Sequence, residues 1–117
     1  MEEIDDQLVT EILRCPEKLF PRFLFGADTL KTVELLNRLI SLSNGYDTVI
    51  DCLSCWQDII GANYCLEPVA AELHQSENTE LLCECLRLIN HLLLYSPNAV
   101  SKIRVQHELK GISDNCQ

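Results

Sequence analysis

Residues 76–100 read SENTELLCECLRLINHLLLYSPNAV and carry the clearest structural signal in the chain. Between a polar run at 75–79 and the Ser96-Pro97 pair, apolar side chains recur with the spacing of a broad helix face. These side chains are Leu82, Cys85, Leu86, Ile89, Leu92 and Leu93. We therefore predict a helix over 79–95, with Ser96 as the N-cap and Pro97 as the first residue of the next helix.

The rest of the 117 residues has the same helical character. Leu-rich periodic segments predict helices within 4–13, 28–42, 46–60 and 66–73, and a short one around 100–103. Helix boundaries are expected at Pro16, Pro21, Asp28, Asn44-Gly45 and Gly61. Trp56 has apolar neighbours and is expected in the core. Because no alternating strand pattern of useful length occurs, we predict an all-α fold in a single domain over 1–117.

The charge of −9 is unevenly distributed, since no Lys or Arg occurs from Leu39 to Leu86. The acids in that interval are Asp47, Asp51, Asp58, Glu67, Glu72, Glu77, Glu80 and Glu84. All of them except Glu77 are taken as a candidate acidic surface. Nucleic acid or an anionic membrane would need the opposite sign, so the expected partner is a protein or peptide, and a basic one suits this charge. The alternative is that these acids only solvate outer helix faces.

The cysteine count and the termini bear on the compartment. Seven cysteines are an odd number, residues 1–6 are acidic where a targeting peptide is basic, and no apolar run approaches the ~18 residues of a membrane span. We expect free thiols and an intracellular location, in the cytoplasm, the nucleus or both.

The positions of the Cys and His residues bear on two further possibilities, zinc binding and catalysis. Cys52 and Cys55 share a helix face, but Cys83 and Cys85 point about 200° apart, which does not suit one zinc ion. His91 is six to eight residues from the latter pair on the same predicted helix, too far for a Cys–His nucleophile. No phosphate-binding loop or nucleophile elbow occurs. We therefore predict that the protein is not an enzyme and that it binds no metal or cofactor. The cysteines are expected to be buried as small apolar residues.

The chain contains a weak internal repeat. A shift of 53 residues places VELLNRLI at 33–40 on LRLINHLL at 86–93, Ser43 on Ser96 and Ile50 on Ile103. Both copies predict a long helix, a polar turn and a short helix. The offset exceeds the ~40–47 residues of HEAT and armadillo units, so an insertion near 58–66 is required.

Over these repeated segments the sequence resembles the armadillo-like (ARM/HEAT-type) helical-repeat superfamily. Residues 76–100 are similar to its pattern of polar turn, long helix with a late Asn, and Ser-Pro-Asn turn; 28–50 are a poorer copy, and 7–14 suit the end of a preceding unit. The resemblance implies an α–α superhelix of about two to three units, with some other helical bundle as the alternative. Since a solenoid needs roughly three units, the chain is then a fragment, an isoform or a domain completed by a partner.

The resemblance also implies a binding mode. In that family an Asn ladder on the long helices binds the backbone of an extended peptide, and the matching residues are Asn37 and Asn90. Glu34 and Arg87, which the repeat superimposes, complete the predicted peptide-binding set. The family's import receptors carry Trp four residues before the Asn, where this chain has Val33 and Leu86, which puts binding of a basic import signal in doubt. Ordinary polar helix positions are the alternative reading of both Asn residues.

The function predicted is therefore that of a non-catalytic protein–protein interaction module, an adaptor or scaffold. A capping or oligomerising piece of a larger solenoid, with self-association, is the first alternative. An import-adaptor-like transport receptor is the second.

Overall fold

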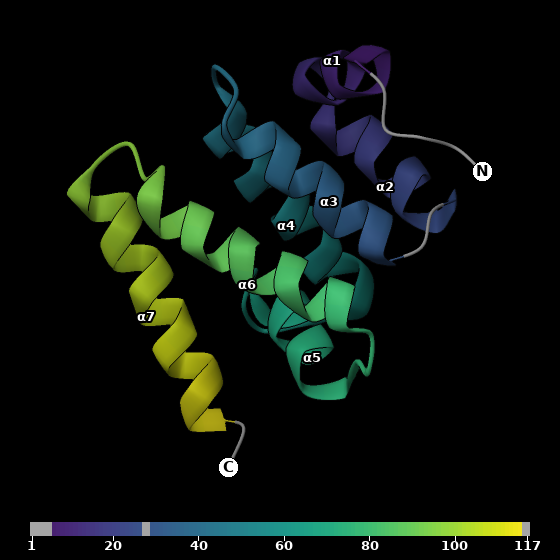
Figure 1. Ribbon diagram of the computed structural model, residues 1–117. Coiled ribbons are helices and arrows are strands. Elements are labelled where there is room, and N and C mark those ends of the chain that lie inside the picture. The colour runs from purple at the N-terminus through teal and green to yellow at the C-terminus, as the bar shows by residue number, and fades with distance from the viewer. Residues whose placement is uncertain (1–5, 27–28, 116–117) are drawn as a thin grey trace.

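The computed structural model describes residues 6–26 and 29–115 (Figure 1). The described part is helical, without strands, which confirms the prediction of an all-α fold. Its helices are α1 (Asp6–Arg14), α2 (Pro16–Gly26), α3 (Thr29–Ile40), α4 (Gly45–Ile60), α5 (Glu67–Gln75), α6 (Thr79–Leu94) and α7 (Ala99–Asn115). The expected cap Asp28 lies outside the described residues.

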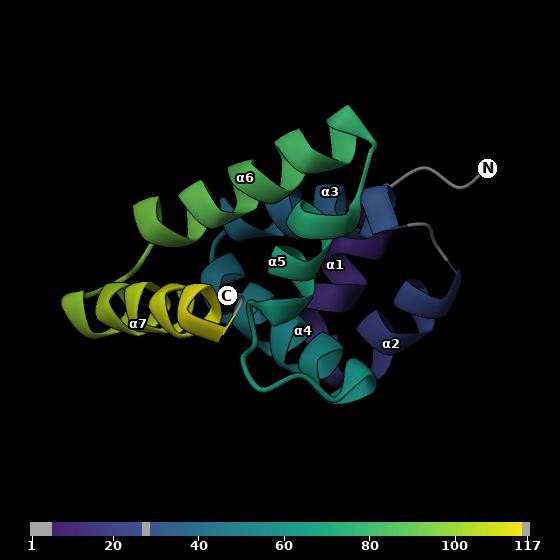
Figure 2. The same cartoon turned by 90° about the horizontal axis from the view of Figure 1, so that it is seen from below.

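The helices form two layers. In Figure 2, α3 and α6 run along one side while α2 and α4 lie on the other, and α7 lies at the end opposite α2. The most extensive helix contact is between α3 and α6; α2 and α3 each pack on α4, and α5 and α7 pack on α6. The two long helices that the internal repeat superimposes are therefore neighbours in space. Whether the chain is an armadillo-type superhelix stays a prediction.

One apolar cluster holds these layers together. Helix α3 is buried on more than half of its circumference and supplies Val33, Leu35, Leu36, Leu39 and Ile40 to that cluster. Trp56 on α4 is buried, as expected. Burial of each Leu or Val side chain contributes about 1.5–3 kcal/mol, so α3 is the element whose removal would cost most.

The connection from α3 to α4 differs in detail from the prediction. Helix α3 ends at Ile40, and Asn44 adopts the left-handed conformation with φ 62°. Gly45 does not end a helix but begins α4, where a Cβ atom would overlap the carbonyl oxygen of Leu39. Close approach of two backbones, rather than a left-handed φ, is therefore the reason for glycine at position 45.

Gly61 ends α4 as predicted. Its φ is 70°, and its N–H donates to the carbonyl oxygen of Gln57, as in a left-handed helix cap.

Two other boundary predictions are wrong. Pro21 does not break the chain but lies inside α2, which loses only one backbone hydrogen bond there while the buried Phe20 anchors it. The N-cap of α7 is Asn98 rather than Ser96: the Asn98 side chain accepts from the N–H of Ser101 at 2.9 Å. The Ser96 hydroxyl instead donates to the carbonyl oxygen of Leu92 at 2.6 Å.

We predict that Gly45→Ala destabilises the protein by roughly 1–3 kcal/mol, because the new methyl group must displace the α3 backbone. Gly61→Ala is the matched control: it has open space around its Cβ position and costs only the left-handed conformation, about 1 kcal/mol. Urea unfolding of both variants measures the difference. Equal losses would mean that the α3–α4 connection has no close contact at position 45.

Candidate functional site

A polar tie joins α3 to α6. The Asn37 amide nitrogen donates to the carbonyl oxygen of Glu84 at 3.0 Å and to its carboxylate Oε1 at 2.9 Å. The amide oxygen of Asn37 lies 3.1 Å from Nδ1 of His91. Since the amide nitrogen faces two acceptors, its oxygen must accept, and Nδ1 of His91 is the donor. One side chain on α3 thereby binds two turns of α6.

The same tie draws in two further side chains of α6. Arg87 pairs with the Glu84 carboxylate at 3.1 Å, three residues along the helix. The His91 ring meets Tyr95 edge-on, with centroids 5.5 Å apart. The tie is thus a short network from Arg87 to Tyr95 along the side of α6 that faces α3.

The two copies of the internal repeat are alike on their inner sides and unlike on one flank. Leu35 and its counterpart Leu88 are both fully buried. Val33 is 0% exposed, however, whereas its counterpart Leu86 is 57% exposed. The same contrast holds for Asn37, which is half-buried, and its counterpart Asn90, which is exposed. The side of α3 that contacts α6 therefore has a counterpart on α6, and this counterpart is exposed.

This uncovered flank is the open face of α6, formed by Leu86, Asn90 and Leu94. The three residues are spaced by four and therefore lie along one line of the helix. Leu94 is 74% exposed, and the buried residues Leu88 and Leu92 occupy the opposite side. Exposed leucines in this arrangement are typical of a surface that another element covers.

The predicted peptide-binding residues are not brought together as one ladder. Both amide hydrogens of Asn37 are used within the protein, so Asn37 has no donor left for a bound peptide. Arg87 is paired with Glu84, and Glu34 is half-buried on α3. Asn90 alone presents an exposed amide. Peptide binding by this set stays a prediction, and the structure gives Asn37 an additional, internal role.

The predicted acidic surface is divided among three helices. Asp47, Asp51 and Asp58 are exposed on α4, Glu67 and Glu72 are half-buried on α5, and Glu80 and Glu84 belong to α6. The pKa of Asp51 is raised above its usual value by partial burial and then by the charges of Glu17 and Asp47. The acids on α4 therefore repel one another, while Glu84 faces α3.

The cysteines and histidines lie apart from the polar tie. Cys52 is buried and Cys55 half-buried on α4; Cys83 is exposed and Cys85 buried on α6. Within 6–26 and 29–115, no group of three or more His, Cys, Asp or Glu side chains has the geometry of a metal site. Over the same residues no helix is long and apolar enough to cross a membrane.

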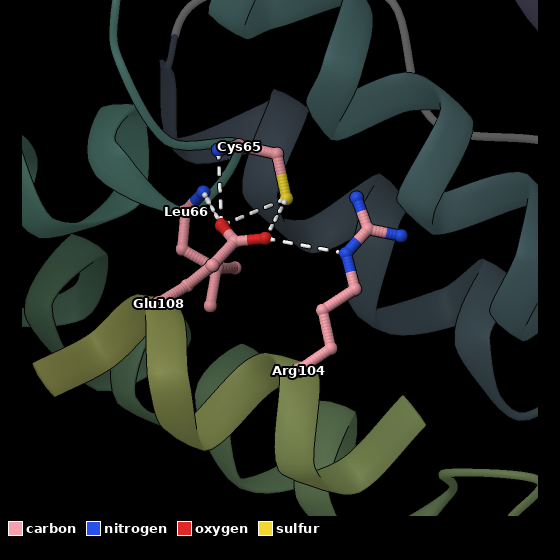
Figure 3. A network of polar contacts seen from close by, with 4 residues as sticks. All are labelled: Cys65, Leu66, Arg104 and Glu108. Atoms are coloured by element: carbon pink, nitrogen blue, oxygen red, sulfur yellow. Dashed lines mark hydrogen bonds and ion pairs between the residues drawn. The ribbon is translucent and has the colours of Figure 1, made fainter. Parts of the chain in front are cut away.

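A second polar cluster, which sequence reasoning missed, holds α7 on the start of α5 (Figure 3). The Glu108 carboxylate accepts from the backbone N–H groups of Cys65 at 3.0 Å and Leu66 at 3.3 Å. It also pairs with Arg104 at 3.4 Å. Leu66 stands at the N-cap of α5 without a capping side chain of its own, so Glu108 supplies the negative charge that a helix start favours. Only the Arg104–Glu108 spacing was visible in the sequence.

The thiol of Cys65 completes this cluster. Its Sγ atom lies 3.2 Å and 3.4 Å from the two carboxylate oxygens of Glu108. Burial, followed by the hydrogen bond to Glu108 and its charge, raises the pKa of Cys65 to about 12, against smaller opposing effects of Arg104 and a backbone hydrogen bond. The thiol is therefore protonated and acts as a donor, and it is not a nucleophile near neutral pH.

An open cleft of about 650 Å³ lies between α5 and the far end of α7. Ala70 and Ala71 line it together with Glu67, His74 and Ile112, among others. A smaller cavity of about 70 Å³ lies beside the Glu108 cluster, between α4 and α7. Cys65 and Glu108 line the smaller cavity, and the raised pKa of that thiol keeps it from acting as a nucleophile near neutral pH.

No protein-family model, curated protein or solved structure matches this chain. The interpretation of the site therefore depends on its own geometry.

We predict that Asn37→Ala destabilises the protein by about 1–3 kcal/mol, because it removes the hydrogen bonds that Asn37 makes to the half-buried Glu84 and His91. Asn90→Ala is the matched control at the equivalent repeat position, and its free energy of unfolding should change by less than about 0.5 kcal/mol. Chemical denaturation of both variants gives the comparison. Equal stabilities would show that the tie contributes nothing to folding.

We also predict a sharp ranking of thiol reactivity. Maleimide at pH 8 should modify the exposed Cys15 and Cys83 rapidly and spare Cys65, of which on the order of one thiol in ten thousand is ionised when its pKa is about 12. The pKa of Cys85 is likewise raised, to about 11, chiefly by burial. Peptide mapping by mass spectrometry measures the ranking, and unfolding in urea should abolish it. Rapid native labelling of Cys65 would contradict the packing of α7 on α5.

Proposed function

We propose that this chain is a non-catalytic protein–protein interaction module that receives a helix of a partner protein along the open face of α6. The comparison of the two repeat copies carries this proposal. A neighbouring helix covers Val33 and Asn37 on α3, whereas their counterparts on α6, Leu86 and Asn90, are exposed. A side chain arrangement that already binds one helix within the fold is available for a second one.

The α3–α6 contact supports a proposal for the chemistry of the partner. The apolar face of the partner helix would cover Leu86 and Leu94. A carbonyl or carboxylate oxygen of the partner would accept a hydrogen bond from Asn90, as Glu84 accepts from Asn37. An extended peptide is less favoured, because a ladder needs successive free amides and Asn37 has none to offer. The exposed Glu80 at the start of α6 favours a basic residue at that end of the partner.

A structural role is the second candidate, because the next unit of a longer solenoid would cover the same face. In that case the face is adapted to one covalently connected unit, and free helices should bind it poorly.

The test is to pan a displayed library of amphipathic helical peptides on the immobilised chain. The wild type should enrich binders, and Leu86→Asp with Leu94→Asp should weaken them at least tenfold, because burying each leucine is worth about 1.5–3 kcal/mol. Asn90→Ala should weaken binding up to about tenfold, the value of one hydrogen bond. Affinities by fluorescence anisotropy provide the measurement.

Leu42→Asp is the matched control, since Leu42 is also exposed but lies in the turn after α3, and it should leave the affinities unchanged. Peptides that bind the Leu86 and Leu94 variant as tightly as the wild type would place the interaction elsewhere. An absence of enriched peptides would favour the structural role.

A further inference from the structure

Helix α5 forms one wall of the open cleft of about 650 Å³ that it shares with the end of α7. Four side chains of α5 that line the cleft fall within about 100° of the helix circumference and so share one side of it: Glu67, Ala70, Ala71 and His74. The first three are half-buried and His74 is exposed, whereas Val69 points to the opposite side and is fully buried. The cleft is therefore backed by the outer side of α5.

The two titratable groups on this side of α5 stand at its two ends, Glu67 in the first turn and His74 in the last. They are separated by about 10 Å of helix and are too far apart to pair with each other. Within the described residues neither side chain takes part in a hydrogen bond or ion pair, and no Lys or Arg lines the cleft. An imidazole donates a hydrogen bond to a carboxylate in its neutral and in its charged form. Each group is therefore available to the other kind of group on a partner.

The centre of the same side is flat and apolar. Ala70 and Ala71 carry only a methyl group each, so a second helix can approach the α5 backbone closely, near the short end of the ~8–10 Å range of interhelical distances. Ile112 of α7 adds an apolar surface to the cleft. The cleft thus combines an apolar centre with a carboxylate at one end of α5 and an imidazole at the other.

We infer that a second copy of this chain docks here, with the two α5 helices antiparallel across a two-fold axis. The midpoint of positions 67 and 74 falls between Ala70 and Ala71. An antiparallel pair centred on that point brings Glu67 of each copy opposite His74 of the other, and the alanines of the two copies meet at the axis. Because all four side chains share one side of the helix, the polar and the apolar positions match in one register.

The contact is isologous, since the same surface of both copies meets, and it therefore closes at a dimer. Helix α5 has 9 residues. One pair of such helices covers less than the ~800 Å² per partner of a standard interface. The charge of −9 on each copy also opposes association, so the dimer is weak and concentration-dependent. It uses neither Leu86 nor Asn90 and stands apart from the proposed function.

Sedimentation equilibrium of the purified chain tests the inference, up to about 0.5 mM protein at about 0.1 M salt. A reducing buffer is needed because Cys15 and Cys83 are exposed. The weight-average mass of the wild type should rise with concentration toward that of a dimer and not beyond it. Glu67→Lys and His74→Glu should each weaken the association at least about tenfold, because the two-fold axis creates every unfavourable pair twice.

An equimolar mixture of these two variants should dimerise again. In the mixed dimer the introduced lysine of one chain faces the introduced glutamate of the other, while His74 of the first chain faces Glu67 of the second. Glu67→Lys combined with His74→Glu in one chain should restore the dimer for the same reason. Ala71→Glu should remain monomeric, because two carboxylates would meet at the axis.

Glu80→Lys and His107→Glu are the matched controls. They repeat the two substitutions at exposed positions of α6 and α7, and Glu80 lies in the first turn of its helix as Glu67 does. Both should associate like the wild type. A wild type that stays monomeric throughout, a mass that rises beyond that of a dimer, an association that Glu67→Lys and His74→Glu both retain, or a mixture that stays monomeric would each overturn the inference.

Discussion

The contact between α3 and α6 is the constraint on which the rest of the structure depends. Apolar burial drives these helices together. Leucine side chains can repack in more than one arrangement at a small cost in free energy, so burial alone does not define the register of the two helices. The Asn37 amide does, since its nitrogen must reach two oxygens of Glu84 while its oxygen reaches His91. Any other register would leave these half-buried polar groups unpaired, at a cost of about 1–3 kcal/mol each. Register between the two long helices then determines which flank of α6 is left uncovered.

A different principle positions the last helix. Helix α7 has few apolar side chains directed inward, and its orientation depends on Glu108, which caps α5 from a distance of more than forty residues in sequence. A carboxylate at a helix start gains from the dipole and from two otherwise unpaired N–H groups. Burial, followed by the hydrogen bond to this carboxylate and its charge, keeps the Cys65 thiol protonated. Glu108 therefore caps α5, attaches α7 to it and contributes to the low reactivity of the Cys65 thiol.

These two contacts leave the molecule with surfaces of distinct chemistry. The open face of α6 is apolar around a single amide, the exposed residues of α7 include apolar and basic ones, and those of α4 include three acids. Helix α7 carries Lys102, Arg104 and Lys110, whereas α4 has no Lys or Arg, so the charge is unevenly distributed over the helices. Such a distribution contributes more to the choice and orientation of partners than to affinity. The proposal for α6 follows from this separation of surfaces.

The sequence by itself determined the helical class, the position of α6 and the burial of Trp56, because periodicity and composition are local properties that each segment carries alone. It also identified Asn37 and Asn90 as a related pair. Only the tertiary structure decided that they differ, since a neighbouring helix covers the first and leaves the second exposed. The capping of α5 by Glu108 was equally invisible, because a hydrogen bond between residues far apart in the chain leaves no periodic signal. Local pattern defines what a helix is, whereas packing decides which of its faces is free to bind.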